Sequence, residues 1–274
     1  MYSGSTLTNI SGNLLGTHQK INRIARGALK DMLKDDKIFP SRRLLLHFEG
    51  KNGPDGMKSK STGRDEPWHF YDPFDPEDGQ LLEIIEDHYA NLVKSLKGKN
   101  RERSAFEAAW LSHAILDGLT PSHHYPFEQK LQELRGGEDK EARDTIIKKI
   151  VIPGDSKAKM IKNNWEYWGA KGLFNLHFLF EWGAGMLILP LPGRIAVPNR
   201  YDIKTINRLG LNEYYKRIAR EVALFDMYSR FYRRGWSPNL YRDIRRELAP
   251  RMAKTVTLAW YMAAKEAEVA SAEV

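Results

Sequence analysis

In two apolar stretches a histidine precedes a carboxylate by four residues: His113 precedes Asp117, and His177 precedes Glu181. In a helix, residues four apart lie on the same face about one turn from each other, so each pair could bind one cation. Imidazole nitrogens and carboxylate oxygens are standard zinc ligands. The 274-residue chain contains no cysteine, so thiolate ligands and disulfides are excluded, and any metal must be held by histidine and carboxylate.

Both pairs lie in apolar stretches that we expect to form buried helices, residues 104–119 and 163–187. Buried imidazoles and carboxylates lose hydration free energy unless a partner compensates for it. One such pair is common in proteins as a hydrogen bond between a core histidine and a carboxylate. Two pairs in apolar helices, with His123 in the loop after the first pair, favour a metal site instead.

The elements that must position these side chains are helical. Apolar residues recur at spacings of three and four, which predicts helices at 17–35, 79–97, 104–119, 163–187 and in further segments towards the C-terminus. Alternation of apolar and polar residues is almost absent. We therefore predict an all-α fold of roughly seven to nine helices. No internal repeat or linker divides the sequence, so residues 1–274 are predicted to form one domain.

The positive charge of the chain is concentrated near its C-terminus. The net charge is +8, and residues 194–251 contain twelve arginines and two lysines against six acidic residues. Aromatic residues are interleaved with these charges. Such a segment could bind nucleic acid or an anionic membrane surface. Amphipathic helices with a solvated arginine face explain the same pattern, and the sequence leaves both interpretations open.

Hydropathy gives no sign of a membrane anchor. A spanning helix needs about 18–20 consecutive apolar residues, and no segment of the chain reaches that length. The first residues also lack the basic start and apolar stretch of a signal peptide. We therefore expect neither a transmembrane segment nor a signal peptide, and the compartment is left open.

The order of several short motifs resembles that of the zinc-dependent phospholipase C / P1 nuclease superfamily. The early histidine of that family, often within GTH, is matched by His18, and its Pro-Asp turn is matched by Asp55 in GPDG. The family's W-H-F-x-D motif is matched by His69 in WHFYD. Asp55 and His69 both fall in the polar segment 48–79, a loop length that is uncommon in a compact domain unless it is functional.

The remaining motifs of the family follow in the same order. The H-x3-D-x5-H motif is matched by His113, Asp117 and His123, and the final H-x3-E motif is matched by His177 and Glu181. The resemblance covers residues 16–182 and implies a single multi-helix domain of the phospholipase C / P1 nuclease type.

The resemblance also implies how zinc would be held. One zinc ion would be bound by Asp55, His69, His113 and Asp117, with Asp117 bridging to another ion. A second zinc would be bound by His123, His177 and Glu181. A third ion in the family uses the early histidine, here His18, the bridging aspartate, and the amine and carbonyl of an N-terminal tryptophan. The chain has no tryptophan before Trp68, so two zinc ions are expected and the third is left open.

The activity implied by the resemblance is hydrolysis of phosphate esters by a hydroxide that zinc supplies at neutral pH. Asp55 would be the catalytic carboxylate that orients or deprotonates the attacking water. Glu181 and the absence of cysteine favour the phospholipase C-like branch, because the nuclease branch tends to have aspartate there and usually carries disulfides. Phospholipid head groups are the expected substrate. A P1-type single-strand nuclease and a non-catalytic zinc-binding scaffold are the alternatives.

Several nearby residues compete for these roles. His124 adjoins His123, but the six-residue step from Asp117 selects His123. Asp65 precedes His69 by only four residues, and the longer spacing and preceding proline favour Asp55.

Three further residues lie outside the predicted ligand set. Asp72 is expected to be a hydrogen-bond partner of a ligand histidine. His47 and His88 match no motif and are expected to be surface or structural histidines.

Overall fold

The computed structural model describes residues 16–49, 52–58, 61–62 and 68–272, and every regular element among them is helical. The prediction of an all-α fold is therefore confirmed. The described part contains thirteen α-helices, more than expected, because short helices occupy stretches that looked like loops. Their bounds are α1 Thr17–Met32, α2 Arg42–His47, α3 Pro54–Lys58, α4 Gln80–Lys97, α5 Arg101–Gly118, α6 Phe127–Leu134, α7 Ile146–Ile150, α8 Lys157–Trp168, α9 Leu173–Ile188, α10 Arg200–Leu224, α11 Met227–Arg234, α12 Pro238–Asp243 and α13 Ala249–Ala272.

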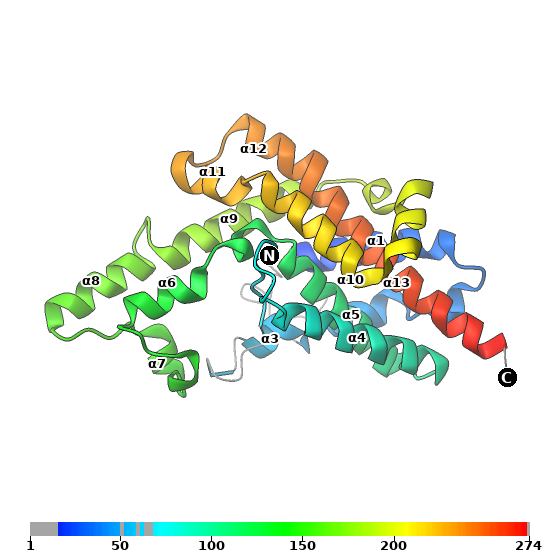
Figure 1. Ribbon diagram of the computed structural model, residues 1–274, viewed down its shortest axis with the longest axis horizontal. Coiled ribbons are helices and arrows are strands. Elements are labelled where there is room, and N and C mark those ends of the chain that lie inside the picture. The colour runs from blue at the N-terminus through cyan, green and yellow to red at the C-terminus, as the bar shows by residue number, and fades with distance from the viewer. Residues whose placement is uncertain (1–15, 50–51, 59–60, 63–67, 273–274) are drawn as a thin grey trace.

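Helix α5 is the buried centre of the main bundle. Its C-terminal part is enclosed on all sides: every residue from 111 to 118 is buried. It packs against α4 along its length and is also contacted by α1, α2 and α13 (Figure 1). The fully buried Trp260 of α13 donates its indole N–H to the carbonyl oxygen of Ala108, at 3.0 Å. A polar residue on the last turns of α5 therefore has to find its partners inside the protein.

Helix α1 brings the N-terminal motif to α5. Its buried face carries Ile21, Ala25, Ala28 and Leu29, at the helical spacing expected from the sequence. This face packs on α13, and the first turn of α1 is also buried. His18 consequently points into the interior although it stands one residue from the start of the helix.

Helices α6, α7 and α8 form a projection beside the bundle, at the left of Figure 1. The projection has a small core of its own, formed by Phe127, Leu131, Ile152, Tyr167 and Leu173. The chain leaves the bundle after a short 3-10 helix, Pro121–His124, and returns through α9. The projection is therefore inserted between two segments that carry predicted metal ligands.

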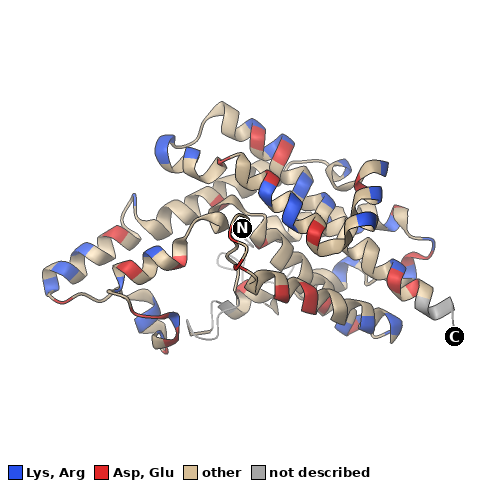
Figure 2. Ribbon diagram, viewed as in Figure 1, with Lys and Arg blue, Asp and Glu red and all other residues tan. Residues whose placement is uncertain are grey.

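The basic segment 194–251 folds as amphipathic helices. Many of its arginines pair with acidic side chains of the same region, including Arg217 with Glu221 at 3.1 Å and Arg230 with Asp243 at 2.8 Å. Figure 2 shows this alternation of blue and red along α10–α12. Four of its aromatic residues are buried in the core: Tyr214, Tyr215, Tyr228 and Phe231. The packing of these helices thus accounts for the buried aromatic residues and the paired arginines, while Tyr201, Tyr232 and Tyr241 are exposed.

No single helix in the described part of the chain has the length and apolar character needed to cross a bilayer. The segments 157–188 and 193–234 satisfy that condition only when taken together, as a pair bent by 110°.

Gly118, the last residue of α5, allows close packing next to the candidate site. A Cβ at this position would overlap the hydroxyl of Tyr215 and a methyl group of Leu81. We expect Gly118→Ala to lower the free energy of unfolding by about 1–3 kcal/mol, as overpacking of a core does. Gly27, in the middle of α1, is the matched control, because a Cβ there meets nothing within 4 Å. Gly27→Ala should raise stability by about 0.5–1 kcal/mol. Urea denaturation of both variants measures the difference, and equal shifts would contradict this account of the packing.

Candidate metal centre

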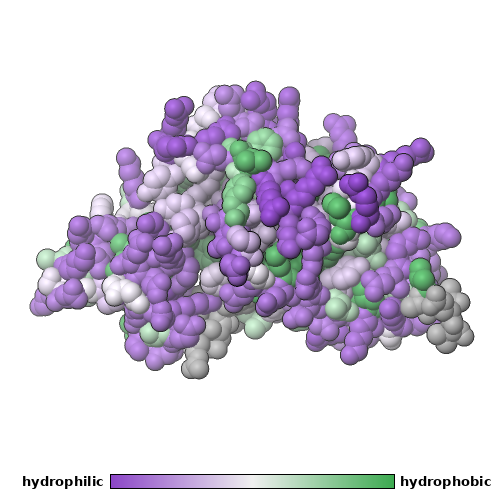
Figure 3. Space-filling view, in the orientation of Figure 1, coloured by the Kyte–Doolittle hydropathy of each residue, from purple (hydrophilic) through white to green (hydrophobic). Residues whose placement is uncertain are grey.

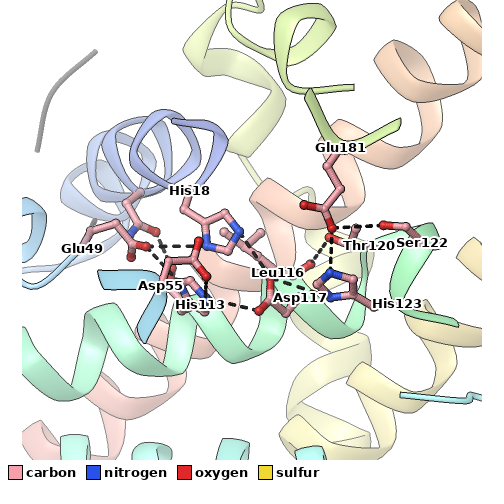
Figure 4. Close-up of polar contacts among 12 residues, drawn as sticks. His18, Glu49, Asp55, His113, Leu116, Asp117, Thr120, Ser122, His123 and Glu181 are labelled. Atoms are coloured by element: carbon pink, nitrogen blue, oxygen red, sulfur yellow. Dashed lines mark hydrogen bonds and ion pairs between the residues drawn. The ribbon is translucent and has the colours of Figure 1, made fainter. Parts of the chain in front are cut away.

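Three ligand-type side chains meet where α1 crosses α5. The Nε2 atom of His18 lies 3.4 Å from Oδ1 of Asp117, and Nε2 of His113 lies 3.2 Å from Oδ2 of the same carboxylate (Figure 4). The ring centroids of the two histidines are 4.2 Å apart. All three side chains are buried, and their ligand atoms lie within 4.8 Å of one another. We call His18, His113 and Asp117 the first cluster.

A second cluster is formed by His123, His177 and Glu181. The Nε2 atoms of His123 and His177 lie 2.7 and 2.8 Å from the same oxygen, Oε1 of Glu181. The two imidazole rings are stacked, with an interplanar angle of 6°. His177 and Glu181 are one turn apart on α9, as their spacing predicts, and His123 comes from the 3-10 helix after α5.

Asp117 lies between the two clusters. Its Oδ1 atom is 3.4 Å from Nε2 of His18 and 3.9 Å from Nδ1 of His123, while its Oδ2 atom faces His113. One carboxylate therefore contacts histidines of both groups. The bridging role that the resemblance implies for Asp117 remains a prediction.

The donor atoms of the first cluster fit a zinc ion. Ligand atoms about 2.0–2.1 Å from a tetrahedral zinc are about 3.3 Å from one another. The separations of 3.2 and 3.4 Å match this value and are long for hydrogen bonds between the same atoms. Both ring nitrogens of the fully buried His18 also lack a hydrogen-bond partner among the described residues. Such an orphaned imidazole costs free energy unless an ion or another donor satisfies it.

The second cluster offers two imidazoles and one carboxylate, which is the ligand number of a zinc site that keeps one position open. Nδ1 of His123 and Nδ1 of His177 are buried and have no hydrogen-bond partner among the residues described. Burial lowers the pKa of His123 to about 4. His123 is therefore neutral at pH 7, which is the form that binds a metal.

Asp55 and His69 lie beside the clusters without joining either of them. Asp55, in the first turn of α3, places Oδ1 3.6 Å from Nε2 of His113, and 24% of its side chain is exposed. The ring of His69 packs against that of His123, with centroids 5.0 Å apart. The structure thus brings all eight predicted ligands into one region. Which ion each residue binds remains a prediction, and His18 is grouped here with His113 and Asp117 rather than with a separate third ion.

The resemblance implies an N-terminal amine as a ligand of a third zinc, and residues 1–15 lie outside the described part of the chain.

Glu49 is a member of the site that the sequence reasoning missed. It is fully buried, and its Oε1 lies 2.9 Å from Nδ1 of His113 and 3.6 Å from Nδ1 of His18. Its other oxygen accepts a hydrogen bond from Asn22 Nδ2, at 3.1 Å. A carboxylate on the outer nitrogen of a ligand histidine fixes the tautomer and the ring orientation. The only signal in the sequence is a charged residue shortly after the three leucines of LLLHF.

The carboxylates at the site are held in their ionised form. Burial raises the pKa of Asp117, but positively charged groups, His113 and His123 among them, lower it, and its pKa lies well below the usual range. His113 acts in the same way on Asp55. Burial lowers the pKa of His113, yet Asp117, Asp55 and Glu49 together raise it well above its ordinary value. In the metal-free protein His113 is therefore protonated, and metal binding would release this proton.

A cavity of about 290 Å³ opens beside the first cluster. Asp55, His69, His113 and Asp117 are among the residues that line it. The other lining residues are mostly apolar or aromatic, and they give the cavity its aromatic wall: Pro54, Trp68, Ile84, His88, Trp110 and Ala114. A small phosphate ester could therefore lie against the ligand set while its substituent contacts the aromatic wall.

The structure shows that the adjacent residues His123 and His124 point in different directions. Nε2 of His124 lies 2.8 Å from the carbonyl oxygen of Gly118 and donates to it, so this ring points away from both clusters. His123 is the member of the pair that joins the site, as expected. Asp65, the competitor of Asp55, lies outside the described residues.

Three other residues have local roles. Asp72 does not orient a ligand histidine as expected; it lies in an exposed turn, where its Oδ1 accepts from the N–H of Phe74 at 2.9 Å. Nδ1 of His88 lies 2.6 Å from the buried carboxylate of Glu107, and His47 is exposed. His88 and His47 thus have the structural and surface positions predicted for them.

Loss of one imidazole from the second cluster should remove one metal ion. We expect His177→Ala, purified and dialysed against zinc, to bind about one ion fewer per chain than the parent, because two protein ligands hold zinc poorly. His47→Ala is the control and should keep the full content. Metal analysis by mass spectrometry gives the numbers, and an unchanged zinc content in His177→Ala would remove this residue from the ligand set.

Glu49 should act on metal affinity through His113. We expect Glu49→Gln to weaken zinc binding by about 10–100-fold, as loss of a carboxylate partner of a ligand histidine does. Glu107→Gln is a matched control, since it also alters a buried carboxylate bonded to a histidine, but one outside both clusters. Competition with a fluorescent zinc chelator measures the zinc affinity of both variants. Equal losses in the two variants would indicate a general effect on folding.

The sequence of the chain has little similarity to those of the known proteins with which it was compared. No protein-family model and no curated protein matches the chain. Among solved structures, the chain is similar to the alpha-toxin of Clostridium perfringens isolated from an avian strain, with 15% sequence identity and a TM-score of 0.47. The match covers 94% of this chain and 64% of the toxin chain, so the chain spans less than two thirds of the length of that protein.

Proposed function

We propose that the protein is a zinc-dependent phosphoesterase that hydrolyses phosphodiester bonds, with phospholipid head groups as its substrates in the manner of a phospholipase C. The observation that carries this proposal is the position of Asp117 between two histidine–carboxylate clusters beside a cavity. Two ligand sets that share one carboxylate are typical of enzymes that transfer phosphoryl groups with two metal ions.

When bound, the zinc ions supply Lewis-acid chemistry, neutralising phosphoryl charge and activating water at neutral pH. The side chains of the protein position the reactants around them. Asp55 is the carboxylate of the site that is partly exposed to the cavity, and His113 keeps it ionised. Its Oδ1 can therefore accept a hydrogen bond from a water molecule and orient it, and we propose that it also receives the proton of that water.

The aromatic wall favours a small organic head group. Trp68 and Trp110 both line the cavity together with the ligand residues. Their rings exclude water and attract quaternary ammonium groups such as choline through cation–π interactions. A cavity of about 290 Å³ is at the lower end for small-molecule sites and suits one head group better than a polynucleotide.

A substrate panel tests the proposal. Zinc-loaded protein should hydrolyse a chromogenic phosphocholine diester and leave single-stranded DNA and RNA intact. Cleavage of nucleic acid alone would replace the phospholipase C-like function with a P1-type nuclease. A zinc-loaded, folded protein that cleaves none of the three would support the non-catalytic scaffold and contradict the proposed function.

Asp55→Asn should lower kcat for the phosphocholine diester by about 100-fold or more, the usual contribution of a positioned general base. Asp72→Asn, in an exposed turn, is the matched control and should leave kcat unchanged. Zinc content is measured in both variants, because Asp55 is also a predicted ligand. Full activity in Asp55→Asn with zinc retained would contradict the catalytic role of Asp55.

A further inference from the structure

Exposed apolar side chains gather on the projection formed by α6–α8. Of the nineteen large hydrophobic residues that are exposed in the described part of the chain, eight lie between residues 146 and 168. They are Ile146, Ile147, Ile150, Val151, Met160, Ile161, Trp165 and Trp168. Figure 3 shows scattered green side chains on the visible face of this otherwise purple projection. Single exposed apolar residues are normal, but a group of this size marks an interaction site.

Helical geometry places these side chains in two stripes. On α8, Ile161, Trp165 and Trp168 follow the i, i+4, i+7 spacing and lie on the side opposite the buried Asn163 and Tyr167. On α7, the three isoleucines 146, 147 and 150 share one side of the helix. Each stripe lacks a covering element among the described residues, because its members are exposed.

Hydrogen bonds hold the two stripes next to each other. The indole N–H of Trp168 donates to the carbonyl oxygen of Ile150, at 2.9 Å. The side chain of Asn164 bonds both backbone groups of Ile152, at 3.1 and 2.7 Å. The end of α7 is thereby fixed to α8. We call the exposed side chains of Ile146, Ile147, Ile150, Ile161, Trp165 and Trp168 the α7–α8 surface.

Positive charge borders the α7–α8 surface. Residues 145–165 contain five lysines and a single acidic residue, Asp155. Figure 2 shows the blue segments on α7 and at the outer end of α8. Lys148 pairs with Asp144 at 2.9 Å and Lys162 with Glu166 at 3.6 Å. All four side chains are exposed, so these pairs are weak and can exchange for other anions.

We propose that the α7–α8 surface docks the protein on an anionic phospholipid bilayer. Isoleucine and tryptophan side chains would enter the boundary between head groups and acyl chains, and the lysines would lie near the lipid phosphates. Binding of single-stranded nucleic acid relies on aromatic stacking, whereas four of the six side chains of the α7–α8 surface are isoleucines. The combination of aliphatic, tryptophan and lysine residues on one face is therefore best matched by a membrane.

The projection that carries the α7–α8 surface is connected along the chain, at both of its ends, to segments of the candidate metal centre. The segment with His123 leads into α6, and α8 leads into α9, which carries His177 and Glu181. Docking itself does not require catalysis. Its use for substrate access, however, rests on the proposed function, since it would hold the cavity close to lipid head groups.

Vesicle binding tests the proposal. Full-length zinc-loaded protein is mixed with unilamellar vesicles of phosphatidylcholine containing 30% phosphatidylserine, and bound protein is measured by flotation. We expect binding to these vesicles and at least tenfold weaker binding to pure phosphatidylcholine. The double variant Ile147→Glu/Ile161→Glu should bind the anionic vesicles at least tenfold more weakly than the parent.

Leu224→Glu is the matched control. Leu224 is 75% exposed, but it lies at the end of α10, outside the projection. This variant should bind vesicles as the parent does. Circular dichroism and zinc content check that all variants are folded, which we expect because the replaced side chains are exposed.

Three results would overturn the proposal. The parent could fail to bind anionic vesicles, or Leu224→Glu could lose vesicle binding as strongly as the double variant. Single-stranded nucleic acid could also displace the protein from the vesicles while the vesicles stay intact. A concentration-dependent dimer that the double variant abolishes would show that a second copy of the chain covers this face instead.

Hydrolysis of a soluble, monomeric phosphocholine diester separates the two proposals. The double variant should keep the parent's rate on this substrate. If the parent hydrolyses the diester but binds no vesicles, docking is wrong and the proposed function stands. If it binds vesicles through this surface but hydrolyses nothing, docking stands and the proposed function is wrong.

Discussion

The burial of one carboxylate determines much of this structure. Asp117 stands on the most enclosed part of α5, where an isolated charge would be strongly unfavourable. Its two oxygens face imidazoles from α1, from α5 itself and from the segment after α5. The helices must therefore cross where these side chains can meet. Both the chemistry of the site and the packing of the bundle therefore follow from the need to give the buried carboxylate of Asp117 polar partners.

The spacing of residues within single helices was enough to predict part of the site. His113 with Asp117, and His177 with Glu181, face the same direction because residues four apart in a helix do so. The apolar character of α5 also predicted its burial. The expectation of one buried helix over 163–187 was wrong: the stretch is broken between α8 and α9, and Leu179, Trp182 and Met186 of α9 are exposed. Local periodicity likewise predicted the all-α fold, since the helical repeat extends through most of the chain.

The contacts between helices could not be obtained in this way. Nothing in the sequence near Glu49 indicates that it reaches both His18 and His113, because those contacts depend on how α1, α2 and α5 cross. The number of helices was also underestimated, since α7 and α12 are too short to show a clear period. Asp72 was assigned to the site by its place in a motif, yet a turn with Phe74 uses its carboxylate.

The projection between His123 and His177 means that a metal ion in the second cluster would also affect the stability of the fold. The ligands of the second cluster lie at the two ends of the long segment between His123 and His177. An ion bound there would cross-link these ends and restrict the conformations of the unfolded polypeptide. The entropy removed by such a cross-link grows with the length of the closed segment. Zinc at this position would thus link the folding of α6–α8 to that of the bundle.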